Sequence, residues 1–261
     1  MVDPRTAQNL RQWERKPSLR AVYQHLYRKM ASECLPGTTL EIGGGSGNFK
    51  QYCNDVVTSD VICAPWLDLV ADGQALPFKG GVFSNIVMFD VLHHVEFPRT
   101  FFAEARRVLI PQGRIVMVEP AITPMSWFFY RFVHQEPFDL SADPLSEGET
   151  SPAKDPYSAN HAIPTILVTR RAQRLTLLFP DLRIRHVRWL SLFAYPLTGG
   201  FKPWSLIPLP FVRPLLRFED AVAGTTGRLF GFRVLITIEK FPVVDGPSAA
   251  AGEAQCSPAL V

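Results

Sequence analysis

The stretch from Leu40 to Asn48, which reads LEIGGGSGN, decides the fold class. It places Glu41 in a short apolar run and then puts four glycines in the five positions after Ile42. Glycines are required where a chain turns sharply with positive φ, or where backbone and ligand approach each other closely. A glycine-rich turn after a buried strand is where an open α/β sheet binds a nucleotide-like ligand. The stretch therefore predicts an α/β sheet with a ligand at this turn.

Two phosphate-binding patterns compete for this turn, and neither fits. The dinucleotide fingerprint Gly-x-Gly-x-x-Gly, counted from Gly43, would need glycine where Asn48 stands, and the P-loop pattern is absent. A carboxylate at Glu41 repels an anion and suits a ligand with amine or hydroxyl donors. The turn thus disfavours a phosphorylated coenzyme and, with it, a nicotinamide oxidoreductase. A tight turn with no ligand is the remaining alternative.

A second carboxylate ends the next predicted strand, Val56–Asp60, which is rich in β-branched residues. The two oxygens of an Asp at this position can accept hydrogen bonds from both hydroxyls of a ribose. The alternative is that Asp60 caps the loop before a helix.

Four stretches in the right order resemble the class I S-adenosylmethionine-dependent methyltransferases, in particular the type 11-like, small-molecule branch. Leu40–Asn48 resembles motif I of that family, and Asp72–Phe78 resembles its Asp-x-x-x-Leu-Pro-Phe stretch. Leu92–His94 resembles its Leu-His-His stretch, and Arg107–Gly113 resembles the Arg-Val-Leu turn before its fifth strand. The resemblance covers Leu40 to Pro120. The family's ligand carries an amino acid end, a ribose and an adenine, and no phosphate.

The resemblance implies a Rossmann-like, doubly wound α/β sheet of seven strands in the order 3-2-1-4-5-7-6, with the seventh strand antiparallel. It implies an N-terminal helical lid over residues 1–35 and a methyltransferase domain over 36–241. A cap with the acceptor region is expected at about 121–165 and 196–230, after strand five. A helix is expected from Pro164 to Phe179, between the two parts of this region. The tail 242–261, rich in Ala, Gly, Ser and Pro, is expected to be disordered.

The resemblance also implies the cofactor, S-adenosyl-L-methionine, which leaves as S-adenosyl-L-homocysteine. Asp72 takes the place of the family's ligand to the adenine amino group. The residues expected to contact the cofactor are Glu41, Gly43, Gly44, Gly45, Gly47, Asp60, Val61, Asp72, Gly73, Phe89 and His93. No metal is predicted, because adjacent histidines rarely bind one ion and no Cys or acid lies at ligand spacing to them.

Residues after Glu119 are expected to form the acceptor site, and they are strongly aromatic: Trp127, Phe128, Phe129, Tyr130, Phe201, Trp204 and Phe211. The alternative, favoured for most of these side chains, is that they form the ordinary core of the cap. This composition predicts a small, apolar or lipid-linked acceptor, with O-methylation favoured. If oxygen is the acceptor, His94, Glu119 and His134 are candidates for the general base. Each of them could instead have an ordinary structural role. The alternative function is a non-catalytic S-adenosylmethionine-binding scaffold or partner subunit.

Composition limits the partners and the location. The chain has 261 residues and a formal net charge of +3, which gives no reason to expect a nucleic acid partner. The N-terminus does not resemble a secretory signal, and four scattered cysteines suggest no disulfide framework, so a cytoplasmic location is predicted. The segment 201–217 interleaves Trp, Phe and Leu with Lys202, Arg213 and Arg217, which predicts peripheral contact with a membrane. The oligomeric state is not predicted.

Overall fold

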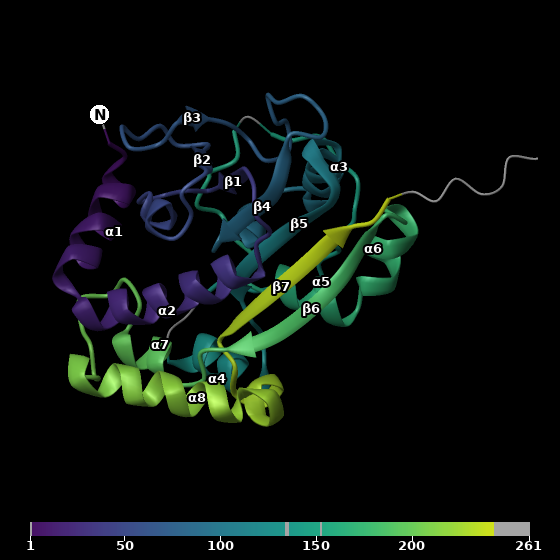
Figure 1. Ribbon diagram of the computed structural model, residues 1–261. Coiled ribbons are helices and arrows are strands. Elements are labelled where there is room, and N and C mark those ends of the chain that lie inside the picture. Colours follow the sequence, from purple (N-terminus) through teal and green to yellow (C-terminus); the bar gives the residue numbers. More distant parts are fainter. Residues whose placement is uncertain (1, 134–135, 152, 243–261) are drawn as a thin grey trace, which may run out of the picture.

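A seven-stranded sheet forms the centre of the protein in the computed structural model, which describes residues 2–133, 136–151 and 153–242 (Figure 1). The strands lie in the order β3-β2-β1-β4-β5-β7-β6. Their bounds are β1 (Thr39–Ile42), β2 (Val56–Asp60), β3 (Leu69–Val70), β4 (Phe83–Phe89), β5 (Leu109–Pro120), β6 (Leu182–Leu190) and β7 (Arg233–Lys240). The order confirms the predicted sheet.

The pairing of the strands places the site. β1 pairs in parallel with β2 on one side and with β4 on the other, so successive crossovers leave β1 in opposite directions. This is the switch point of the sheet, where a crevice opens beyond the carboxyl ends of the strands. β7 runs antiparallel to both of its neighbours, β5 and β6, as predicted.

Helices cover both faces of the sheet (Figure 1). The α-helices are α1 (Pro4–Arg15), α2 (Pro17–Glu33), α3 (Pro98–Val108), α4 (Pro124–Phe132), α5 (Ile163–Thr169), α6 (Ala172–Leu178), α7 (Ala194–Thr198) and α8 (Leu209–Phe230), and the 3-10 helices are η1 (Asn48–Gln51) and η2 (Leu92–His94). Several of them begin with proline, which is tolerated there because the first amides of a helix have no partner in it.

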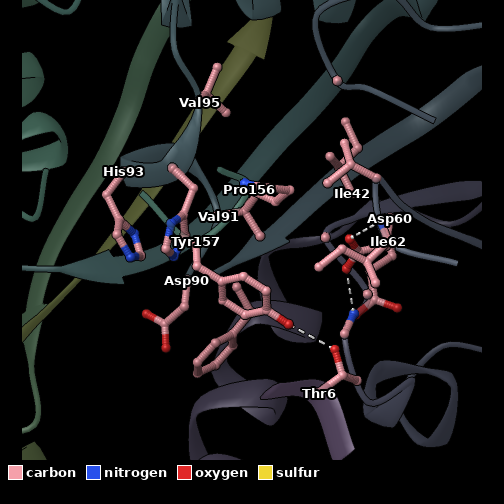
Figure 2. A pocket seen from close by; sticks show the side chains of 18 of the residues that line it. Thr6, Ile42, Asp60, Ile62, Asp90, Val91, His93, Val95, Pro156 and Tyr157 are labelled. Carbon is pink, nitrogen blue, oxygen red and sulfur yellow. Dashed lines mark hydrogen bonds between the residues drawn. The ribbon is translucent and has the colours of Figure 1, made fainter. Parts of the chain in front are cut away.

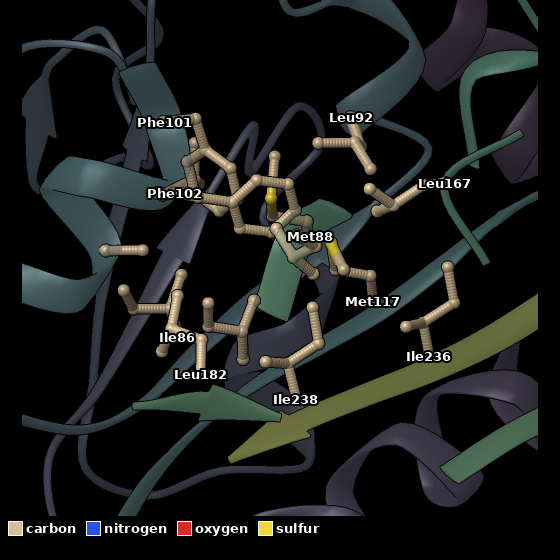
Figure 3. Close-up of a cluster of buried hydrophobic side chains, with 14 of the residues drawn as sticks. Ile86, Met88, Leu92, Phe101, Phe102, Met117, Leu167, Leu182, Ile236 and Ile238 are labelled. Carbon is tan, nitrogen blue, oxygen red and sulfur yellow. The ribbon is translucent and has the colours of Figure 1, made fainter. Parts of the chain in front are cut away.

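Alternate residues of the central strands belong to two different cores. In β4, Ile86 and Met88 join the cluster that contains α3, α5 and α6, and Figure 3 shows part of this cluster. Val87 and Phe89 join the second cluster, with α2 and α8. Successive side chains of a strand point to opposite faces, so a strand buried on both faces reads as a continuous apolar run.

Two expectations about the second half are corrected. The helix expected from Pro164 to Phe179 is split into α5 and α6, because Arg170 and Arg171 both donate their amides to the Ile166 carbonyl and the chain turns. The segment 201–217 contains the start of a 22-residue helix, α8, which the prolines concealed. Pro210 lies in its first turn, where proline is tolerated, and Pro214 interrupts only one backbone hydrogen bond.

Two further observations concern membrane-spanning helices and the C-terminal tail. Among the described residues, no helix combines the length and the apolar character needed to span a bilayer. The tail predicted to be disordered lies, beyond Pro242, outside the described residues.

Candidate active site

A cavity of about 590 Å³ lies at the carboxyl ends of β1, β2 and β4 (Figure 2). It has two ends that differ in their lining. The glycine end consists of 41–46, 60–62 and 71–74. The arginine end consists of Tyr23, Asp90, His93, His161, Tyr195, Phe201 and Arg233. A volume of this size suits one small ligand with room for a second.

The glycine turn is held in one conformation by its own backbone. Gly43, Gly45 and Gly47 have φ values of 71°, 47° and 68°, which L-residues with side chains rarely adopt. The Gly44 amide donates to the Ser59 carbonyl at 2.9 Å. A Cβ on Gly43 would lie 2.2 Å from Cγ2 of Val91. Glycine is therefore required at this position both by φ and by space.

Gly47 differs from the other predicted cofactor residues because it does not line the cavity. A Cβ there would lie 2.8 Å from Cδ1 of Trp66, whose indole Nε1 donates to the Gly45 carbonyl at 2.7 Å. Gly47 therefore supports the turn from behind. The other ten predicted cofactor residues all border the cavity.

Glu41 places an unsatisfied carboxyl oxygen at the glycine end. Its side chain is buried, and Oε2 has no hydrogen-bond partner. Burial, and next the charge of Asp60, raises the pKa of Glu41 to about 8. A buried oxygen without a partner costs free energy until a donor satisfies it. An ammonium or hydroxyl group fits this position, whereas a phosphate does not.

Asp60 and Asp72 border the same end of the cavity. Asp60 accepts the Gly45 amide at 3.0 Å and the Ile62 amide at 2.9 Å, so its carboxylate is fixed at the end of β2 (Figure 2). Asp72 accepts the Gln74 amide at 2.9 Å. The glycine end thus has three carboxylates and a bare backbone turn. These hydrogen-bond acceptors fit S-adenosylmethionine, which offers donors in its ammonium group, its ribose hydroxyls and its adenine amino group.

His93 and Glu119 form a buried pair at the arginine end of the cavity. Nδ1 of His93 lies 2.7 Å from Oε2 of Glu119, while Oε1 accepts the amides of Val91 and Leu92 at 2.9 and 2.7 Å. Burial lowers the pKa of His93 and raises that of Glu119 to about 7. Because Nδ1 donates to the carboxylate, the second nitrogen, Nε2, is left as a proton acceptor.

The predicted candidates for the general base differ in their access to the cavity. Glu119 is fully buried and does not line the cavity, so it can act only through His93. His94 lines the cavity, with its ring centroid 4.1 Å from that of His93 and its Nδ1 3.2 Å from the Ser158 carbonyl. His134 lies outside the described residues.

His161 is a third histidine beside His93 and His94, and no sequence motif singled it out. Its ring lies 4.7 Å from that of His93, and its Nδ1 lies 3.0 Å from the Pro137 carbonyl, to which it donates. Burial lowers the pKa of His161 to about 3, so the ring is neutral. Within the described ranges, no group of three or more His, Cys, Asp or Glu is arranged to hold a metal ion.

The arginine end is built around an ion pair that was also missed. Arg233 begins β7 and pairs with Asp90, which follows β4 and has a φ of 58°. The guanidinium lies 4.2 Å from the centroid of the Tyr195 ring, and its side chain is only 3% exposed. Nε of Arg233 is buried without a hydrogen-bond partner. The one sequence feature that could have identified Arg233 is its position directly before the apolar run 234–236.

Most of the aromatic residues predicted for the acceptor site do not line the cavity. Of the seven aromatic residues proposed for the acceptor site, only Phe201 borders the cavity. The aromatic side chains that do line the arginine end come from α2 and α7, namely Tyr23 and Tyr195. Aromatic composition alone does not distinguish the wall of a pocket from a surface.

The N-terminal helix meets a distant segment at the border of the cavity. The guanidinium of Arg5 donates to both oxygens of Asp155 at 2.9 and 3.0 Å and lies 3.7 Å from the centroid of the Tyr157 ring. Tyr157 is also 2.9 Å from the hydroxyl of Thr6 (Figure 2). We call these contacts the clasp. Thr6 and Tyr157 both line the cavity, so α1 and the segment 154–157 meet at the border of the cavity.

The sheet order and the carboxylate-lined glycine turn define the class of protein: an α/β fold of the class I methyltransferase topology. Residues 40–117 match the family model described as "Methyltransferase domain". The predicted resemblance to a methyltransferase domain is thereby confirmed over these residues.

Individual relatives are more distant. An uncharacterised protein of Methanocaldococcus jannaschii is 29% identical over 104 residues, which are 37% of this chain and 51% of that protein. The match thus spans about half the length of that relative.

Solved structures with a similar chain path include two methyltransferases. A geranyl diphosphate C-methyltransferase from Streptomyces coelicolor, in complex with Mg²⁺, geranyl diphosphate and S-adenosyl-L-homocysteine, has a TM-score of 0.48 at 14% identity, covering 84% of this chain and 77% of that one. A S-adenosylmethionine-dependent methyltransferase from Archaeoglobus fulgidus has a TM-score of 0.46 at 13% identity, covering 85% and 94%.

Proposed function

We propose that the protein transfers a methyl group from S-adenosylmethionine to a hydroxyl group of a small acceptor with an apolar body. The observation that carries this proposal is that His93, paired with Glu119, lines the same cavity as the glycine end, whose unsatisfied carboxyl oxygen suits the cofactor's ammonium group. Methyl donor and proton acceptor would then share one cavity. Tyr23, Tyr195 and Phe201 offer the acceptor an aromatic wall.

The bound cofactor would supply an electrophilic methyl group on a sulfonium, so the protein mainly has to orient the acceptor. His93 would take the proton of the acceptor hydroxyl on Nε2 as the new O–C bond forms and the S–C bond breaks. Glu119 would hold the imidazole in the required tautomer and stabilise the imidazolium. Positioned general bases of this kind contribute about 10²–10⁴-fold to rate.

The proposal is tested in two separate measurements. Calorimetry with S-adenosyl-L-homocysteine measures cofactor binding, and a labelled-methyl assay over fractionated small-molecule and lipid extracts measures transfer. In the His93→Gln variant we expect the rate of methyl transfer to fall about 100-fold or more. Its affinity for S-adenosyl-L-homocysteine should change less than a few fold. Unchanged transfer in that variant would remove His93 as the base.

One observation favours the alternative, a scaffold or partner subunit that binds the cofactor without transferring a methyl group. Burial lowers the pKa of His93, which weakens it as a base. In that case wild-type protein would bind S-adenosyl-L-homocysteine and label no fraction of any extract.

A further inference from the structure

Most of the exposed large hydrophobic side chains of the described residues gather on one part of the molecule. They lie on α4, on α8 and on the linker before α8: Met125, Trp127, Phe128, Phe132, Val133, Trp204, Leu206, Leu209, Phe211, Phe218 and Leu229. We call this surface the α4–α8 face. The two helices contact each other and lie at the same edge of the molecule (Figure 1). Exposed apolar patches of this kind mark interaction sites.

The sequence of α8 divides it into an inner and an outer side. Val212 and Leu216 are buried against the core that contains α2. Phe211, Phe218 and Leu229 are separated by seven and eleven residues, so at 3.6 residues per turn they form a single outer stripe. Phe211 is 64% exposed. The stripe is therefore not part of the fold's own core.

Two exposed cations flank the apolar side chains of this face. Arg131 lies on α4 one turn after Trp127 and Phe128, on the same side of that helix, and Arg228 is exposed about a quarter of a turn around α8 from the stripe. Arg213 and Arg217 instead border the grooves between α8 and α2, and Asp220 on that side is engaged by His25 and Lys29 of α2. A face with aromatic and aliphatic side chains beside arginines matches the acyl chains and the anionic head groups of a lipid surface.

The α4–α8 face adjoins the arginine end of the cavity. The linker before α8 carries Phe201, which lines the cavity, and Trp204, which is exposed on the face. α8 ends at Phe230, three residues before Arg233, and α4 begins soon after Pro120, which also lines the cavity. Whatever covers this face thus lies next to the arginine end.

We propose that the α4–α8 face docks onto the surface of a bilayer that contains anionic phospholipid. The docking is argued from this surface and does not depend on the proposed function. The purpose of the docking, which is to bring a lipid-embedded acceptor to the arginine end, rests on the proposed function. The apolar stripe enters the interfacial region, and the arginines contact phosphate groups.

The test is flotation of the full chain with vesicles of phosphatidylcholine alone and with vesicles that also contain phosphatidylglycerol. We expect binding to the anionic vesicles. Phe211→Ser with Phe218→Ser should lower the affinity at least tenfold, and Arg131→Gln with Arg228→Gln should remove the preference for phosphatidylglycerol. Leu177→Ser is the matched control, because Leu177 is 73% exposed but lies on α6, away from the face, and it should change nothing.

Three outcomes would overturn the docking proposal: no flotation of wild-type protein, equal flotation of the Phe211 and Phe218 variant, or a loss equally large in the Leu177 control. Sedimentation without vesicles tests a second copy as the occupant. A stable dimer that the Phe211 and Phe218 substitutions dissociate would assign the face to self-association instead. Calorimetry with S-adenosyl-L-homocysteine on the same preparation keeps failure of docking distinct from failure of the proposed function.

Discussion

The glycine end of the cavity is shaped by backbone, whereas the arginine end is shaped by buried side chains. At the glycine end, the alternate glycines Gly43, Gly45 and Gly47, all with positive φ, turn the chain, and the amide of Gly45 fixes the carboxylate of Asp60. At the arginine end, Asp90, Arg233 and Tyr23 meet from three elements far apart in the sequence. The glycine end tolerates few substitutions because its shape depends on the backbone conformation. The arginine end can bind a different ligand after exchange of a few side chains, so we expect acceptor specificity to be determined there.

The largest effect should come from substituting the glycine turn. Gly43→Ala places a Cβ in collision with Val91 and forces an unfavourable φ, and we expect binding of S-adenosyl-L-homocysteine to be lost in calorimetry. Gly81→Ala is the matched control, because Gly81 has a φ of 68° with no atom within 4 Å of an added Cβ. It carries only the strain of φ, about 1–2 kcal/mol. Equal binding losses in the two variants would show that the space beside Val91 is not decisive.

The second effect tests the arginine end through stability. Arg233→Met leaves the carboxylate of Asp90, which is 24% exposed, without its cation, and removing one partner of a buried pair costs at most about 3–5 kcal/mol. The free energy of unfolding, measured in urea, should fall by up to that amount while affinity for S-adenosyl-L-homocysteine stays within a few fold. Arg185→Met is the control. It breaks a more exposed pair with Glu239 and should cost less than about 1 kcal/mol. A cofactor affinity that collapses with Arg233 would contradict the separation of the two ends.

The smallest effect is a pH dependence at the glycine end. Burial raises the pKa of Glu41 to about 8, so below that pH its carboxyl is largely protonated and must ionise to pair with an ammonium group. Affinity for S-adenosyl-L-homocysteine should therefore rise between about pH 6 and 8, by at most tenfold per pH unit. Glu41→Gln should flatten the profile. A wild-type affinity that falls over the same interval would exclude an ammonium group as the partner of Glu41.

The sequence was informative where the site is contiguous. Glu41, the glycines and Asp60 lie at the ends of two adjacent strands, and their order in the chain reproduces their order in space. Arg233 was missed because its contact with Asp90 depends on sheet order: β7 returns antiparallel beside β5, so that Arg233 aligns with Pro120. His161 was missed because it follows a proline-rich segment without periodicity. α8 was missed because its prolines suggest a loop, while burial of Val212 and Leu216 favours a helix.

The clasp has a consequence for the timing of a catalytic cycle. Arg5 and Thr6 of the N-terminal helix reach Asp155 and Tyr157 beside the cavity, so two segments about 150 residues apart are joined at its border. The pair between Arg5 and Asp155 is half-exposed, so its hold is weak and sensitive to salt. Raising the ionic strength should therefore loosen this border of the cavity and leave the backbone-held glycine turn unchanged, so exchange of the nucleoside product should depend on salt.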